Sequence, residues 1–367
     1  MSEITVLIID DSAVVRQVLS AIINDTAGMK VIATAADPVF AFKKLETIKP
    51  DVITLDIEMP RMDGLTFLKK LMKENPYPVV MCSTLTHKSS ASSIKALRLG
   101  AVEIVAKPTS NLKKELGAQS KLIITAIRVA AKAKVRNLSI QPKKTPTILD
   151  GQRKQTADVI LPKLSKVSPK PSNKLVAIGA STGGTIALEY VISSLKNDSP
   201  GVVIVQHMPA AFTAAFSSRL NSVAEVYVKE AEDGDMVEMG KVLIAPGGKH
   251  MMIDNRAGKL YVLIKNGPLV SRHRPSVDVL FRSVAQSAAK QTLGIIMTGM
   301  GDDGANGMKE MFDHGAFTVA QDEESCVIFG MPGVAIERGG VRKICPLNFI
   351  PKMINAFNRP VDFKQYL

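Results

Sequence analysis

Short apolar runs alternate with helix-like segments through the first 108 residues, and this alternation strongly limits the folds that the chain can adopt. The runs are apolar almost without interruption, as expected for strands whose two faces are both covered. Five strand and helix units in succession predict a doubly wound parallel sheet. The five runs are TVLIID (5–10), KVIATAA (30–36), DVITLDI (51–57), PVVMCST (78–84) and VEIVAKP (102–108).

A basic, proline-rich segment interrupts the alternation. Residues 137–172 contain five prolines and no sustained periodicity, which is typical of an extended linker. Residues 110–174 hold 15 Lys or Arg against three acidic residues, so a net +12 of the chain's +13 lies there. The folded parts are therefore nearly neutral, which does not indicate a nucleic-acid-binding surface. We expect one domain over 1–125, a helix end and linker over 126–172, and a second domain over 173–367.

The second half of the chain predicts another α/β domain with a mostly parallel sheet. A helix is expected over 276–289, and a hairpin around Asn255–Gly258. The remainder of residues 232–274 shows little regular alternation. Strands are expected at KLVAIGAS (174–181), GVVIVQH (201–207), AEVYVKEA (224–231), LGIIMTG (293–299), AFTVAQD (316–322) and RKICP (342–346).

Several classes of protein are not indicated by the composition. No apolar run reaches the roughly 18 residues that a membrane span needs, so we expect a protein that is not membrane-embedded. The N-terminus carries Glu3, Asp10 and Asp11 where a signal peptide would have basic and small residues, which predicts a cytoplasmic protein. The three cysteines are widely spaced and lack a CxxC pair, so we expect reduced thiols.

Chemically complementary side chains follow the strands of the first domain. Asp10 and Asp11 follow the first strand, Asp56 the third, Ser83 the fourth and Lys107 the fifth. The carboxyl ends of parallel strands share one edge, where the functional crevice of an open sheet lies. Crowded carboxylates need a cation, and oxygen ligands suit Mg²⁺. One of these carboxylates can then attack a phosphoryl donor, while the hydroxyl and the ammonium group hold the transferred oxygens.

The motifs IIDDS, LDIEMPRMDG and AKP resemble the receiver domain of bacterial response regulators over residues 4–125. The resemblance implies a flavodoxin-like (βα)5 fold with Asp56 as the phosphoacceptor. It implies Asp11 and Asp56 as Mg²⁺ ligands, Asp10 in the outer shell and the Glu58 carbonyl as a further ligand.

The hydroxyl role in this family belongs to a Ser or Thr after the fourth strand. This chain has both Ser83 and Thr84 there, and the alignment of PVVMCS favours Ser83, beside Lys107 as the other phosphoryl contact.

A glycine-rich turn follows the first strand of the second domain. Gly179, Ser181 and Gly183 have the G-x-S-x-G spacing of a nucleophile elbow, in which glycines allow a tight turn that exposes the hydroxyl. The motif alone also allows a phosphate-binding loop, although it does not match G-x-G-x-x-G.

Other strand ends favour the nucleophile. His207 ends the next strand, and Asp302 and Asp303 follow LGIIMTG, so a serine, a histidine and a carboxylate meet at one edge. These groups suit acyl transfer, with the histidine as base and the carboxylate as its orienting partner. The chain order Ser, His, Asp differs from that of α/β-hydrolases.

Backbone amides near Met300 or Thr182 are candidates for an oxyanion hole. Of the other histidines, His250 opens the expected hairpin. His273 in SRHRPSVD is a candidate pocket residue, but a basic loop is the favoured interpretation.

The motifs AIGASTGG, VVIVQHMP, SRHRPSVDVLF, MTGMGDDGANGM and SCVIFGMPGVAIERG resemble the chemotaxis protein-glutamate methylesterases of the CheB type over residues 174–360. The resemblance implies Ser181 as nucleophile, His207 as base, Asp303 rather than Asp302 as the triad acid, and the Met300 amide as an oxyanion donor.

The same resemblance implies a phosphorylation-activated hydrolase that acts on γ-glutamyl methyl esters and glutamines of methyl-accepting chemoreceptors. It implies a chemotaxis histidine kinase as phosphodonor, Mg²⁺ for the receiver only, and no cofactor for hydrolysis. We expect the unphosphorylated receiver to dock over the Ser181 pocket. The alternatives are an output domain that binds a nucleotide or a nucleic acid.

Overall fold

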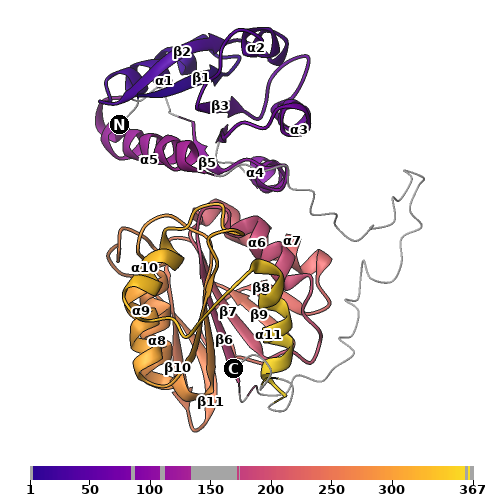
Figure 1. The fold of residues 1–367 in the computed structure, drawn as a ribbon, viewed down its shortest axis with the longest axis vertical. Coiled ribbons are helices and arrows are strands. Elements are labelled where there is room, and N and C mark those ends of the chain that lie inside the picture. The colour runs from indigo at the N-terminus through magenta and orange to yellow at the C-terminus, as the bar shows by residue number, and fades with distance from the viewer. Residues whose placement is uncertain are drawn as a thin grey trace, which may run out of the picture.

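The structure is a computed structural model that describes residues 3–83, 87–107, 112–133, 172, 174–359 and 363. These residues form two α/β domains stacked along the long axis of the molecule (Figure 1). Apart from Ser172, the expected linker over 137–172 lies outside the described residues, as does Thr84.

The described part of the first domain contains a five-stranded sheet in the order β2-β1-β3-β4-β5, and every pair in it is parallel. The predicted doubly wound (βα)5 fold is therefore confirmed. The strands are β1 (Ile4–Ile9), β2 (Met29–Ala35), β3 (Val52–Asp56), β4 (Val79–Ser83) and β5 (Glu103–Ala106).

Helices cover both faces of this sheet, as the continuous apolar strands require. One hydrophobic cluster joins the sheet to α1 (Ala13–Asn24) and α5 (Leu112–Lys132). A second cluster joins the other face to α2 (Pro38–Leu45), α3 (Gly64–Glu74) and the end of α4 (His87–Arg98). Asp37 and Asp63 cap the N-termini of α2 and α3 with their carboxylates, which satisfies backbone N–H groups that have no partner within the helix.

The described part of the second domain contains a seven-stranded parallel sheet in the order β14-β13-β12-β6-β7-β9-β8, with a separate β10-β11 hairpin. The mostly parallel sheet predicted for this domain is confirmed. The strands are β6 (Leu175–Ala180), β7 (Gly201–Gln206), β8 (Tyr227–Glu230), β9 (Lys241–Ile244), β10 (His250–Arg256), β11 (Lys259–Lys265), β12 (Thr292–Ile296), β13 (Phe317–Gln321) and β14 (Lys343–Cys345).

Two local features of this domain show where sequence patterns succeed and fail. The predicted hairpin is confirmed by the antiparallel pairing of β10 and β11. Ala257 and Gly258 in its turn both take the positive φ that a tight two-residue turn needs. Strand β9 was missed, since its four residues lie within a stretch that showed no alternation. It lies between β7 and β8 and pairs with both strands, and these pairings join residues that are not neighbours in the chain.

The helices of this domain again form two layers. One face packs against α6 (Gly184–Ile192), α7 (Ala210–Val223) and α11 (Ile350–Phe357). The other packs against α8 (Val277–Ser287), α9 (Ala305–Asp313), α10 (Met331–Glu337) and the hairpin. Two 3₁₀ turns, η2 (Ala289–Gln291) and η3 (Leu347–Phe349), precede β12 and α11.

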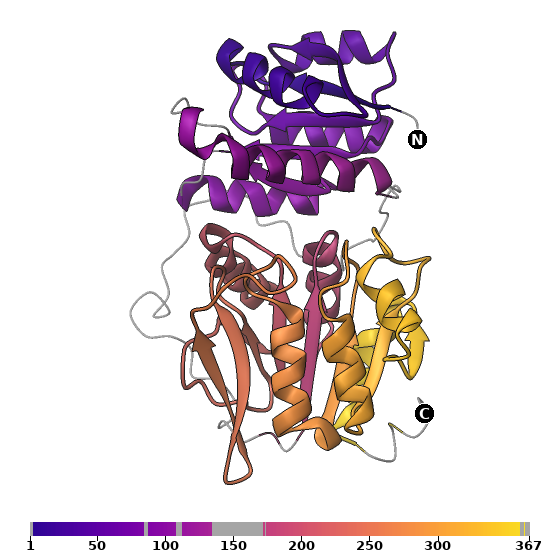
Figure 2. The same cartoon turned by 90° about the vertical axis from the view of Figure 1, so that its left-hand side faces the viewer.

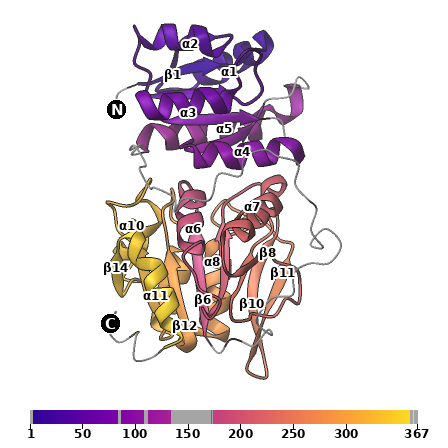
Figure 3. The same cartoon turned by 90° about the vertical axis from the view of Figure 1, so that its right-hand side faces the viewer.

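The two domains contact each other through α4. This helix lies against α6 and α7, and Ile94 belongs to the hydrophobic cluster of the second domain (Figures 1 and 3). Arg98 forms an ion pair of 3.1 Å with Glu189 of α6. Figure 2 shows the first domain lying across one end of the second domain's strands.

No helix among the described residues is long and apolar enough to cross a membrane.

Candidate active site

The strand order places the candidate nucleophile at the centre of the second sheet. From β6 the chain builds outward first through β7 and later through β12 on the opposite side, so the direction of winding reverses at β6. Ligand-binding crevices form at such switch points, outside the carboxyl ends of the strands. Ser181 follows β6, His207 follows β7, and Asp303 lies in the loop after β12.

Both glycines of the G-x-S-x-G motif are required by their surroundings. At Gly179 a Cβ atom would lie 2.2 Å from a methyl carbon of Val277 on α8. Gly183 has φ +80°, and a Cβ there would lie 2.6 Å from Val327. The first glycine thus admits a close helix, and the second admits a left-handed turn that a residue with a side chain would adopt only under strain.

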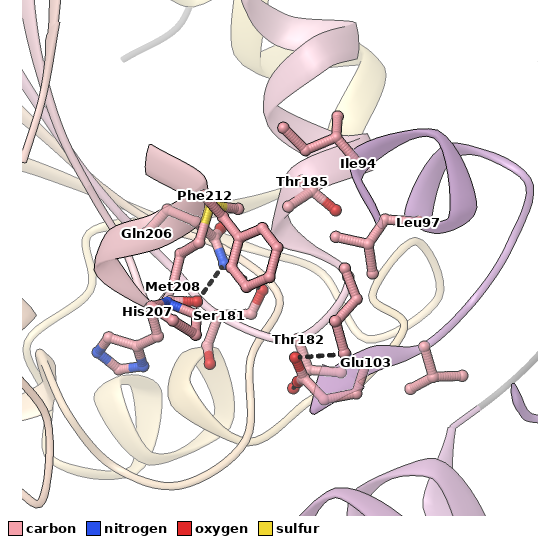
Figure 4. A pocket seen from close by; sticks show the side chains of 14 residues that line it. Ile94, Leu97, Glu103, Ser181, Thr182, Thr185, Gln206, His207, Met208 and Phe212 are labelled. Carbon is pink, nitrogen blue, oxygen red and sulfur yellow. Dashed lines mark hydrogen bonds between the residues drawn. The ribbon is translucent and has the colours of Figure 1, made fainter. Parts of the chain in front are cut away.

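Gln206 connects the backbones of the candidate nucleophile and base. Its Nε2 donates to the carbonyl of Ser181 at 2.9 Å and to the carbonyl of His207 at 3.0 Å. The Ser181 amide in turn donates to the Thr298 carbonyl at 3.0 Å. Ser181 and His207 therefore project from a strand edge held by side-chain and main-chain hydrogen bonds, and they line one pocket (Figure 4).

The hydrogen bond between His207 and Asp303 determines the tautomer of the histidine. Nε2 of His207 lies 2.7 Å from Oδ2 of Asp303, and the ionised carboxylate only accepts, so Nε2 carries the proton. Nδ1 is buried and has no hydrogen-bond partner among the described residues. It is therefore the nitrogen with a lone pair available to accept a proton.

Asp303 is bound by the N-terminus of α8. Its carboxylate accepts from the Ser276 hydroxyl at 2.7 Å and from the amides of Val277 at 2.7 Å and Asp278 at 3.1 Å. Burial raises the pKa of Asp303, but the hydrogen bonds and charge of His207, together with Ser276 and Val277, outweigh it and hold the pKa below its usual value. The group is thus an anion that can stabilise a charged imidazole.

The neighbouring carboxylate lies elsewhere. Asp302 is half-buried and pairs with Arg338 at 3.2 Å, so of the two aspartates Asp303 is the one in contact with His207. Residue type and chain position alone do not distinguish these two aspartates, whereas the family resemblance favours Asp303.

The expected oxyanion residues both lie beside the first domain. Thr182 is buried, and its hydroxyl donates to Glu103 of β5 at 3.0 Å. Met300 is partly buried against the receiver's α1 and α5 cluster. No sequence signal pointed to Glu103, because its partner lies 79 positions away.

The interpretation of His273 as part of a basic loop is wrong. Its ring stacks on that of His207, with the centroids 3.7 Å apart and the planes 5° apart. The loop between β11 and α8 brings this ring to the site, which the local sequence did not reveal.

The receiver's strand ends bring together the residues expected there. Lys107 Nζ lies 2.7 Å from Asp56 and 3.1 Å from Asp10. Burial raises the pKa of Asp56 to about 6, although Lys107 opposes the rise. Ser83 is buried at the end of β4, beside β5.

These carboxylates suit a hard cation. Carboxylate oxygens of Asp10, Asp11 and Asp56 lie within 4.8 Å of one another, a donor set that fits Mg²⁺. Glu58 has an exposed side chain, and its amide donates to Asp56 at 3.3 Å.

The first domain restricts the pocket beside Ser181. Receiver residues Ile94, Leu97 and Glu103 line this pocket together with the glycine turn (Figure 4). The cavity is about 30 Å³, and one water molecule needs roughly 10–15 Å³. Its volume therefore corresponds to about two water molecules.

Two family sequence profiles match the chain. The response regulator receiver domain matches residues 6–116, and CheB methylesterase matches residues 176–354. The protein is therefore a response regulator whose receiver is joined to a methylesterase domain.

Curated relatives identify the family over nearly the whole length. A protein-glutamate methylesterase/protein-glutamine glutaminase of Pseudomonas savastanoi pv. phaseolicola is 54% identical, with 96% of this chain and 98% of the relative covered. Another of Shewanella oneidensis is 53% identical, over 97% and 99%. The CheB methylesterase catalytic domain of Thermotoga maritima is 39% identical and covers 50% of this chain and 97% of its own, with a TM-score of 0.48. The chain belongs to the CheB family of receiver-linked methylesterases.

Proposed function

We propose that this protein hydrolyses γ-glutamyl methyl esters on methyl-accepting chemoreceptors to glutamate and methanol, and deamidates receptor glutamines to glutamate. The observation that carries the proposal is the hydrogen-bonded His207–Asp303 pair beside Ser181 at the switch point of the sheet. The names of the relatives support the substrate class.

Hydrolysis then proceeds in two steps. Ser181 Oγ attacks the ester carbonyl while Nδ1 of His207 takes its proton, and the proton passes to the departing methoxy group. The Ser181–glutamyl ester is cleaved by water, whose proton passes through His207 back to Ser181. Asp303 stabilises the imidazolium in both steps, and amides at Met300 and Thr182 bind the oxyanion. These reaction steps need no cofactor.

The first domain supplies control. In the proposal Asp56 is the phosphoacceptor, with a chemotaxis histidine kinase as donor. Asp11, Asp56 and the Glu58 carbonyl would hold Mg²⁺, with Asp10 in the outer shell, and the ion would neutralise charge during phosphoryl transfer. Ser83 and Lys107 hold the transferred oxygens. We propose a cytoplasmic location, because such a donor and substrate act there.

In the proposal, the docked unphosphorylated receiver inhibits the esterase. The small cavity and the bond between Glu103 and Thr182 support a closed state in which substrate has no room beside Ser181. Phosphorylation weakens docking and raises the open population. We propose 1–125 and 173–367 as the two domains, joined through 126–172.

Methanol release from methylated chemoreceptor fragments tests the activity. Wild type should release methanol, and Ser181→Ala should lose nearly all release while remaining folded. Equal release from both would overturn the assignment of Ser181. A nucleotide titration then tests the nucleotide-binding alternative, and DNA retention without residues 137–172 tests the nucleic-acid alternative.

The regulation has a separate test. Beryllofluoride with Mg²⁺ mimics a phosphoryl group on the receiver and should raise the esterase rate. An unchanged rate would refute control by docking and leave the esterase assignment intact.

A further inference from the structure

His273 has no part in the proton transfers described above, yet it makes the closest ring contact in the site. The imidazoles of His207 and His273 lie parallel at 3.7 Å, so one face of the base is covered by a second flat ring. The hydrogen bond to Asp303 holds only one edge of His207. Rotation of an aromatic ring about its terminal torsion is broad unless neighbours restrict it.

The loop that carries His273 is held in an unfavourable conformation. Ser271 and Arg272 have φ of 49° and 69°, a region that residues with side chains rarely adopt. Two hydrogen bonds of 3.0 and 2.8 Å between Val270 and His273 close the turn. The Ser271 hydroxyl donates to Asp278 on α8 at 3.1 Å. Strain of this kind persists where the surroundings over-determine a conformation, and it concentrates at functional sites.

The ring of His273 is neutral in this setting. Its Nδ1 donates to the Ser271 carbonyl at 2.8 Å, so Nε2 has the free lone pair. Burial, the neighbouring His207 and Arg272 lower the pKa of His273 to about 4, while Asp303 opposes the decrease. A neutral ring lies against His207 without repelling the imidazolium that forms during proton transfer.

We propose that His273 is a positioning residue, whose flat ring holds the His207 imidazole in the plane that directs Nε2 to Asp303 and Nδ1 to Ser181. This inference rests on the proposed esterase function. It adds a fourth residue to the site, one that acts on the base without touching substrate or exchanging a proton.

Three substitutions separate stacking from other roles. His273→Phe keeps a flat ring that does not titrate, His273→Leu keeps apolar volume without a ring, and His273→Arg keeps a flat group with permanent charge. Each protein is checked for folding by circular dichroism and thermal melting. Methanol release then gives kcat and KM for each variant and for wild type.

Stacking predicts an ordered set of rates. His273→Phe should keep kcat within about 3-fold of wild type, while His273→Leu should lose about 10- to 100-fold in kcat with KM nearly unchanged, as misplacement of a catalytic group predicts. His273→Arg should move the acidic limb of kcat/KM to lower pH, since positive charge beside His207 disfavours its protonation.

Three results would overturn the proposal. Full activity of His273→Leu would show that the stack is dispensable. A change confined to KM would show contact with substrate. If His273→Phe lost as much kcat as His273→Leu, a hydrogen bond from His273 would be the active feature rather than its flat shape.

A second readout does not depend on activity. The chain has five histidines, so the C2–H resonance of His207 can be assigned by substitution and titrated by NMR. The pKa of His207 should fall in His273→Arg. If wild type released no methanol but the titration changed as expected, the esterase proposal would fail and the stacking contact would stand. An unchanged titration in a folded variant would overturn the contact itself.

Discussion

Shortening Ile94 tests whether docking of α4 keeps the enzyme inactive. The side chain is 5% exposed and packs in the hydrophobic cluster of the second domain. Burial of one methylene contributes about 0.8 kcal/mol, so Ile94→Val should weaken docking by about 0.8 kcal/mol and Ile94→Ala by about 2.4 kcal/mol. Since about 1.4 kcal/mol is tenfold, the open fraction should rise about 4-fold and about 50-fold, up to the fully open limit.

The assay is methanol release without phosphodonor, which reports the open fraction. Basal rates should rise in the order wild type, Ile94→Val, Ile94→Ala, while the rate with beryllofluoride should change little because that state is already open. Ile23→Val is the matched control, since Ile23 is buried between α1 and the opposite face of the receiver sheet. Unchanged basal rates in folded Ile94 variants, or an equal rise in the control, would refute this account of docking.

Three further substitutions test single groups. Asp303→Asn should lower kcat by about 10⁴-fold. Because the pKa of Asp303 is lower in the folded protein than in the unfolded chain, the ionised carboxylate stabilises the fold above the unfolded pKa of about 3.9, and this stabilisation is lost as pH falls through the folded pKa. The urea midpoints of variant and wild type should therefore converge below about pH 4. Burial raises the pKa of Glu103 in the docked protein, so docking should weaken as pH rises through this raised pKa. The basal rate of wild type should therefore rise with pH more than that of Glu103→Gln, whose side chain still accepts a hydrogen bond from Thr182. Asp56→Asn should abolish activation by phosphodonor without changing the basal rate, and activation that persisted would place the phosphorylation elsewhere.

Much of both sites followed from local patterns. Asp10, Asp56 and Lys107 were predicted to meet because each follows an apolar strand, and parallel strands present their carboxyl ends at one edge. Ser181 and His207 followed by the same reasoning. A short strand in a stretch without regular alternation did not, as β9 shows: its four residues pair with β7 and β8, which the local sequence does not indicate.

The sequence by itself determined the two α/β domains, the strand ends that carry the chemistry, and the family through its long motifs. The family resemblance favoured Asp303 over Asp302, but only the tertiary structure decided that Nδ1 of His207 is the free nitrogen and that His273 covers the ring. It also decided that Glu103 contacts Thr182 across the domains. Periodicity and turn residues act over a few positions, whereas these contacts join side chains far apart in the chain, and packing alone brings them together.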